Sequence, residues 1–233
     1  MHIFRLLLVL LLSTTAQVII AADFIKGFEA IQKSDFVTAL AEFYPLAQEG
    51  DSDAQFYIGT MHQYGQGVPQ DHKTATGWLL KSALQGNHLA ELSLGIMYEK
   101  EDELGGGTQQ DYKEAVKWYS LAAESGILEA QMSLGQIYST VLVDDKKAVK
   151  WFSIAAKQGN AKAQFYLGLR YFKGAGVLSD FTRSYMWFNL SGYNGASSAS
   201  KAKEIVMLDM TTTQIAKAQE MSNRCLNSNY DDC

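Results

Sequence analysis

The residues best placed to do chemistry are two cysteines, Cys225 and Cys233, in the last nine residues of the chain. Thiols this close in sequence pair in an oxidising compartment. In the chain-entropy description, closing so small a loop is worth about 2–3 kcal/mol, enough to hold a fraying helix end but not a whole fold. A redox-active or metal-binding pair is the alternative, but the Cys-x-x-Cys spacing is absent. We expect a structural disulfide.

The other candidates for metal or phosphate chemistry stand alone in the sequence. His62, His72 and His88 form no His-x-x-x-His group that could complete a metal shell. A phosphate-binding glycine loop follows a strand, and no strand is predicted before Gly105 to Gly107. The acidic segment Glu99 to Gln110 lacks the spacing of an EF-hand and is expected to be a solvated loop. We expect no metal and no cofactor.

Composition and charge narrow the class of protein. Of the 233 residues, 47% are apolar and 19% are charged, with only 2 Pro, which excludes a disordered chain or a collagen. The 20 Lys and Arg against 25 Asp and Glu give a formal charge of -5 and form no basic stripe, so we expect no nucleic acid partner. A soluble, mildly acidic, helix-leaning protein remains.

Residues 1–22 are typical of a secretory signal peptide, with Arg5, an apolar run from Leu6 to Leu12 and a small-residue exit at Ala21-Ala22. The apolar run is much shorter than the roughly 20 residues that a membrane helix needs. The later Val18 to Ile20 leaves an uncleaved anchor as the alternative. We expect an exported protein, periplasmic or secreted, with no membrane span after cleavage.

A repeat of about 36 residues organises the rest of the chain. Its leading glycines are Gly50, Gly86, Gly126 and Gly159, with a degenerate fifth unit at Gly195. Nine residues after the first four stands a second glycine, in this order: Gly59, Gly95, Gly135 and Gly168.

Two further positions recur before each leading glycine. Eight residues before the last four stands every Trp of the protein: Trp78, Trp118, Trp151 and Trp187. The first unit has Glu42 there instead. Seven residues earlier stands an aspartate that can cap a helix N-terminus: Asp35, Asp71, Asp111, Asp144 and Asp180. Each unit is therefore predicted as an Asp cap, a helix of about 13 residues, a Gly turn, a second helix of about 12 and a loop.

Apolar residues in both helices recur with helical spacing. One such stripe is Ala115, Trp118, Tyr119, Ala122 and Ala123. A glycine inside the second helix is unfavourable by about 1 kcal/mol unless it lets a neighbouring helix approach closely. Because no helix pair can bury its stripe alone, consecutive pairs must stack into an all-α, right-handed solenoid.

The ends are predicted to close this stack. Residues 23–34 are expected to form an N-terminal capping helix, 35–195 the repeats, and 196–233 C-terminal cap helices. Thr211-x-x-Gln214 and Asp111-x-x-Glu114 have the spacing of a capping box.

His62 holds the position that Tyr98, Tyr138 and Tyr171 hold in the later units. We therefore expect it to take part in an aromatic stack rather than to bind a metal.

The segments Gly65 to Asp71 and Ala148 to Asn160 resemble the loop and first helix of the SEL-one-like repeat family, a branch of the tetratricopeptide-type solenoids. The resemblance covers about residues 35–195 and implies a superhelix of four to five helix pairs in an exported bacterial protein. The loops at Glu99 to Gln110 and Ser139 to Asp145 depart from the family pattern, so a regular pitch is not expected there.

Some family members are linked to β-lactamase or penicillin-binding activity, so Ser198-x-x-Lys201 and Ser200-x-x-Lys203 are candidate nucleophile and base pairs. The companion Ser-Asp-Asn and Lys-Thr-Gly motifs are missing, and so are the cysteines that mark that subgroup within each repeat. We expect no enzymatic activity.

The tetratricopeptide comparison implies a concave face lined by the first helices, which binds a partner. The candidates on it are Lys73, Thr76, Lys113, Lys117, Lys147 and Lys150. Such a basic strip would suit an acidic or extended peptide, or an envelope polymer; alternatively, these lysines only solvate the helices. The leading hypothesis is a non-enzymatic exported adaptor that binds a protein or peptide. The alternatives are a penicillin-recognising hydrolase and a peptidoglycan- or exopolysaccharide-binding protein.

Overall fold

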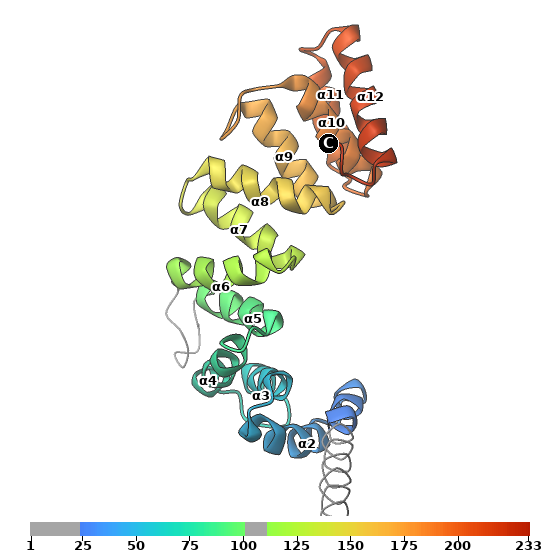
Figure 1. The fold of residues 1–233 in the computed structure, drawn as a ribbon. Helices are drawn as coiled ribbons and strands as arrows, with labels where there is room; N and C mark the ends of the chain where they lie inside the picture. The colour runs from blue at the N-terminus through green and yellow to red at the C-terminus, as the bar shows by residue number, and fades with distance from the viewer. Residues whose placement is uncertain (1–23, 101–110) are drawn as a thin grey trace, which may run out of the picture. The chain divides into compact units, whose positions relative to one another are not determined.

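The computed structural model describes residues 24–100 and 111–233, and all regular structure in these ranges is α-helical (Figure 1). The predicted signal peptide at 1–22, Gly105 to Gly107 and most of the acidic segment lie outside the described residues. No helix in the described ranges is long and apolar enough to cross a membrane.

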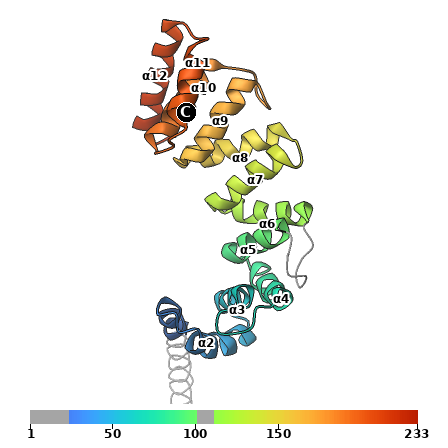
Figure 2. The same ribbon diagram turned by 180° about the vertical axis from the view of Figure 1, so that it is seen from behind.

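Residues 24–32 are helical and precede eleven helices (Figures 1 and 2). These are α2 (Phe36–Glu49), α3 (Ser52–Tyr64), α4 (His72–Ala83), α5 (His88–Glu99), α6 (Tyr112–Glu124), α7 (Leu128–Thr140), α8 (Asp145–Lys157), α9 (Ala161–Lys173), α10 (Phe181–Tyr193), α11 (Ala199–Met207) and α12 (Thr212–Asn227). The pairs α2–α3, α4–α5 and α8–α9 pack against each other, and α3, α7 and α9 also pack on the first helix of the next pair. The predicted alternation of first and second helices is confirmed.

The chain forms two compact units, one up to Trp118 and one from Tyr119 onward. In the first unit, Phe43, Ile58 and Met61 are fully buried in one core cluster, and Leu79 and Leu94 in another. In the second unit the corresponding clusters surround Phe152 and Phe188. Each cluster draws buried residues from several consecutive helices, as expected of stacked repeats.

The aspartates start the first helices as predicted. Each accepts a hydrogen bond from the backbone N–H three residues later, at 2.9–3.1 Å: Asp35, Asp71, Asp111, Asp144 and Asp180. The side-chain and backbone hydrogen bonds from Thr38, Thr74 and Lys147 lower the pKa of three of these carboxyl groups, those of Asp35, Asp71 and Asp144.

Only one of the two predicted capping boxes is complete. Thr211 and Gln214 satisfy each other's backbone N–H groups at the start of α12. At α6 the Asp111 N–H instead donates to the Tyr98 carbonyl at 2.8 Å, and Glu114 pairs with Lys117 at 3.0 Å. The capping-box spacing at Asp111 therefore yields a single cap, because the preceding second helix already supplies the acceptor.

The glycines inside the second helices lie where neighbouring helices cross. A Cβ at Gly59, Gly135 or Gly168 would lie 2.7, 2.5 or 2.8 Å from Leu79, Phe152 or Phe188, respectively. No side chain fits at these distances, so the close helix approach predicted from these glycines is confirmed at all three.

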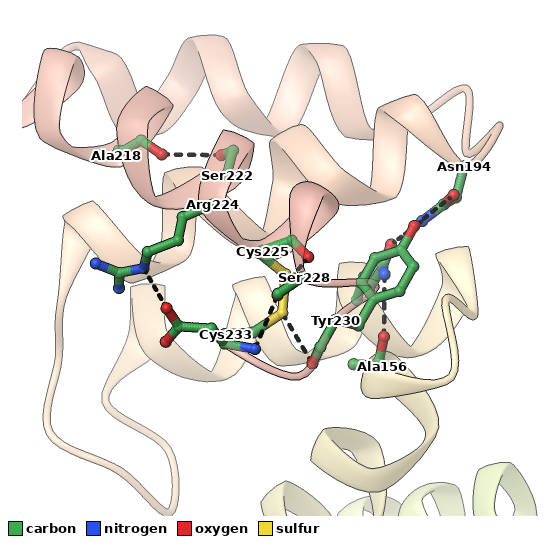
Figure 3. The surroundings of a disulfide bond; sticks show 11 residues. Ala156, Asn194, Ala218, Ser222, Arg224, Cys225, Ser228, Tyr230 and Cys233 are labelled. Atoms are coloured by element: carbon green, nitrogen blue, oxygen red, sulfur yellow. Dashed lines mark hydrogen bonds and ion pairs between the residues drawn. A yellow bond between two sulfur atoms is a disulfide. The ribbon is translucent and has the colours of Figure 1, made fainter.

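The two ends are covered by additional helices. The helical segment 24–32 packs on the first unit through Phe24, whose ring centroid lies 5.4 Å from that of Phe43. At the other end α11 and α12 pack on α10, and the tail after α12 is tied back by a Cys225–Cys233 disulfide with 4.8 Å between the Cα atoms (Figure 3). These covers shield apolar faces that end repeats would otherwise expose.

Candidate functional site

A pocket of about 740 Å³ opens in the first unit between α2, α3 and α4. Its walls are mostly apolar, and the residues that line it are Val37, Leu40, Ala41, Tyr44, Pro45, His62, Val68, Thr74 and Trp78. A pocket of this size can hold one or two amino-acid side chains or a small ligand.

The loop between α3 and α4 shapes one wall. Gly65 ends α3 with φ 68°, and Gly67 follows with φ 72°. A Cβ at Gly67 would lie 2.9 Å from the backbone oxygen of Phe36, so only glycine lets the loop rest on the start of α2. Val68, the next residue, is thereby brought into the pocket wall.

Trp78 lines the pocket because its surroundings differ from those of the other three tryptophans. Trp118, Trp151 and Trp187 are only 4–7% exposed, whereas Trp78 is half-buried. In the first unit Glu42 replaces the tryptophan of the repeat, and it pairs with Lys26 of the N-terminal helical segment. With no indole on α2, one side of Trp78 stays accessible.

Two aromatic rings in the pocket wall, those of Tyr44 and Trp78, lie close to the ammonium group of Lys81. The rings of Tyr44 and Trp78 meet edge to face with centroids 6.1 Å apart, and Lys81 Nζ lies 4.1 Å from the Trp78 centroid. No ion pair within the described ranges includes Lys81. Val37 and Tyr44 are 73% and 43% exposed, so α2 presents apolar side chains to solvent.

Two polar groups lie in the pocket wall. Pro45 lies inside α2 and has no N–H, so the Ala41 carbonyl does not receive the usual helical hydrogen bond from the residue four positions later. His62 Nδ1 is buried and has no hydrogen-bond partner among the described residues. The structure places His62 in this wall. The pocket thus combines an apolar surface with a carbonyl that lacks its usual helical donor and a buried ring nitrogen.

The predicted basic strip lies elsewhere. Its lysines are exposed on α4, α6 and α8, but Thr76 is half-buried and donates to the His72 carbonyl at 2.8 Å. Lys117 pairs with Glu114 at 3.0 Å, and Lys147 with Asp144 at 3.1 Å. The hydrogen bond to Asp144 is the main reason that the pKa of Lys147 is raised.

The remaining lysines of the predicted strip are Lys73, Lys113 and Lys150. Lys150 Nζ lies 5.0 Å from the centre of the Trp151 ring. None of the six residues predicted for the strip lines the pocket. Two features of the sequence could have indicated the pocket: the apolar residues of α2 around Pro45, and Glu42 in place of the tryptophan of the repeat.

The candidate serines lie at the start of α11. Ser198 and Ser200 are both exposed. Lys203 Nζ donates to Asn189 Oδ1 at 3.0 Å, and within residues 111–233 no hydrogen bond joins either serine to Lys201 or Lys203. In the described ranges, no three His, Cys, Asp or Glu residues are grouped to hold a metal ion.

Helix pairs stacked on common cores define an all-α solenoid built from repeats. The sequence model of the Sel1 repeat matches residues 52–87, 88–127, 128–160 and 161–195, more than half of the chain. The chain therefore belongs to the Sel1 repeat family, as the SEL-one-like resemblance predicted. Proteins of this family are generally non-catalytic scaffolds for protein interactions.

One solved structure supports the fold. The chain is 26% identical to a Sel1 repeat protein from Oxalobacter formigenes, with 84% of each chain covered and a TM-score of 0.68. It is also 26% identical to c5321, a protective antigen of uropathogenic Escherichia coli with an SLR fold, at a TM-score of 0.48. That match covers 83% of this chain and 50% of the antigen. No curated protein sequence matches the chain significantly.

Proposed function

We propose that this protein is an exported, non-enzymatic adaptor of the bacterial envelope that binds an extended segment of a protein partner, with an apolar side chain of that segment seated in the α2–α4 pocket. The observation that carries the proposal is the half-buried Trp78, which meets Tyr44 edge to face in the wall of an apolar pocket. Aromatic anchors in pockets of this kind supply much of the binding energy at protein interfaces.

The polar groups around the pocket specify the partner further. The Ala41 carbonyl, to which Pro45 cannot donate the usual helical hydrogen bond, can accept one from a peptide N–H. Lys81, whose Nζ lies over the Trp78 ring, attracts a carboxylate. The partner segment therefore carries an apolar residue next to an acidic one.

Two observations support an envelope location. Residues 1–22 have the pattern of a secretory signal, and the Cys225–Cys233 disulfide forms readily in an oxidising compartment. Expression of the full chain followed by cell fractionation tests this part. Recovery of a shortened, disulfide-bonded chain outside the cytoplasm is the expected result.

The pocket is tested with the chain from Asp23 onward as bait against envelope extract. Val37→Glu places a carboxylate at the mouth of the pocket, opposes an acidic partner and leaves the core intact, since Val37 is 73% exposed. We expect wild type to capture a protein at least tenfold more efficiently than this variant. Leu178→Glu, at a residue that is 91% exposed in the second unit, is the matched control and keeps wild-type capture.

Two outcomes would replace the proposal. Sedimentation with purified cell wall that both glutamate variants retain would assign the protein to polymer binding. Nitrocefin turnover that Ser198→Ala or Ser200→Ala abolishes would make it a hydrolase.

A further inference from the structure

A polar joint recurs where consecutive helix pairs meet. A buried glutamine at the start of a second helix donates to a carbonyl near the end of the preceding first helix, and the distances are 3.0 Å from Gln55 to Ala47, 3.2 Å from Gln131 to Ala123 and 3.0 Å from Gln164 to Ala156. The oxygen of each glutamine accepts from a side-chain amide at the end of the next first helix: Gln85 at 2.9 Å, Gln158 at 2.8 Å and Asn194 at 2.9 Å. We name these the Gln55, Gln131 and Gln164 joints.

The Gln164 joint is covered by the chain's own tail (Figure 3). The Tyr230 hydroxyl lies 2.7 Å from Nδ2 and 2.9 Å from Oδ1 of Asn194, the outer amide of the joint. The Tyr230 ring rests beside Gly159, where a Cβ would lie 3.3 Å from it. The tail thus shows which side chain fits a joint of this composition: a phenol whose ring takes the space beside the glycine and whose hydroxyl reaches the amide.

The other two joints have the same parts, and no described residue covers them. Gly50 and Gly126 hold the position of Gly159, with φ 104° and 92°, and no atom of the described residues beyond their immediate chain neighbours lies within 4 Å of a Cβ built on either. Gln85 and Gln158 hold the position of Asn194 and are exposed. Because φ is positive at both glycines, a residue with a side chain would be strained there, and the space beside each outer amide stays open.

Helix α5, the second helix of its pair, does not have such a joint. Glu91 replaces the glutamine of the joint and lies 3.1 Å from His88 Nδ1. A carboxylate cannot donate to a carbonyl, so this position does not form the same joint.

We propose that the Gln55 and Gln131 joints each bind a tyrosine side chain from an extended segment of a partner protein, in the way that Tyr230 occupies the Gln164 joint. The inference rests on the proposed function in that the ligand is a peptide, but it uses none of the residues that line the α2–α4 pocket. Each joint supplies one hydrogen bond and one ring contact, so a single tyrosine binds weakly, and affinity comes from occupying several sites at once.

The test is a titration of the isotope-labelled chain from Asp23 onward, followed by the NMR signals of its side-chain amides. The probe is a synthetic peptide with the tail sequence Leu-Asn-Ser-Asn-Tyr-Asp-Asp. We expect the amide signals of Gln85 and Gln158 to shift at millimolar peptide. A peptide with Phe in place of Tyr should bind about fivefold more weakly, because it lacks the hydroxyl.

Variants separate the joints from non-specific contact. Gln85→Ala removes the response near Gly50 and leaves that of Gln158, and Gln158→Ala does the reverse. Gln32→Ala, at an exposed glutamine outside the joints, changes neither. The proposal is overturned by an absence of shifts up to about 10 mM, a binding regime that is already very weak, or by equal shifts with a peptide carrying Ala in place of Tyr.

The two proposals fail separately. Val37→Glu should leave the shifts at the joints unchanged, so loss of capture by that variant reports on the pocket alone. If the tyrosine peptide causes no shifts but the partner is still captured, the proposal for the joints is wrong and the proposal for the pocket stands.

Discussion

Single aspartates set where the first helices begin. Their carboxylates accept the backbone N–H groups that a helix start leaves unpaired, and these bonds favour the ionised form. The pKa values of Asp35, Asp71 and Asp144 are therefore below their ordinary value of 3.8 in the folded chain. Since the unfolded chain takes up these protons first as the pH falls, the caps contribute to stability above pH 3.8 and lose that contribution below it.

We predict that Asp35→Asn, Asp71→Asn and Asp144→Asn, combined in one chain, flatten the fall in stability below about pH 4. Asparagine caps a helix about as well as aspartate but does not titrate, so stability at pH 7 should change little. Urea unfolding midpoints measured from pH 7 down to about pH 2.5 check this. Parallel pH profiles for wild type and variant would show that these caps do not couple folding to protonation.

The spacing of the tryptophans defined the repeat, but it did not predict the pocket that Trp78 lines. Glu42 stood out as the exception among five equivalent positions. Glu42 pairs with Lys26 of the N-terminal segment. That contact joins residues 16 positions apart and leaves no periodic trace in the sequence.

At the scale of elements, glycines inside helices serve two different purposes. Gly135 lies in α7 against the fully buried Phe152, at 2.5 Å from a built Cβ. Gly77 lies in α4 with nothing within 4 Å. The first glycine permits a helix crossing, and the second only lowers helix propensity.

We expect opposite signs for the two alanine substitutions. Gly135→Ala should destabilise the second unit by about 1–3 kcal/mol, because Phe152 has no room to move. Gly77→Ala should stabilise by about 0.5–1 kcal/mol through helix propensity alone. Equilibrium urea unfolding of both variants measures the difference, and a stabilising Gly135→Ala would mean that the crossing is looser than the structure shows.

Helix bounds followed from the sequence because caps, glycine turns and apolar stripes are local signals. The joints did not. An Ala-Gln pair stands at the start of three of the four second helices α3, α5, α7 and α9, but the function of these glutamines depends on a carbonyl eight residues earlier and an amide 27 to 30 residues later. Such contacts exist only once the pairs have stacked.

At the scale of the whole molecule, the repeats divide into two units within α6, although no turn residue marks the point in the sequence. The disulfide belongs to the second unit, where Cys225 is fully buried in a core cluster and Cys233 anchors the tail. Its effect on stability should therefore be confined to that unit.

Cys233→Ala tests this because it opens the cross-link and leaves the buried Cys225 in place. We predict a loss of about 2–3 kcal/mol in the second unit, the chain-entropy value for so short a loop. Hydrogen exchange should become faster in α10 and α12 and stay unchanged in α3. Equal acceleration in α3 would show that both units unfold together.

The joints also make the repeats interchangeable. At a joint, a unit that starts with Ala-Gln needs a carbonyl at the end of the preceding first helix and a Gln or Asn at the end of the following one. Three junctions of this chain meet this rule, so units exchanged there would keep the partners of the joint glutamines. The unit with Glu91 has no such joint, because Glu91 pairs with His88 of its own helix. Changes in the length of such an array are then a matter of copying matched ends, without redesign of the helices between them.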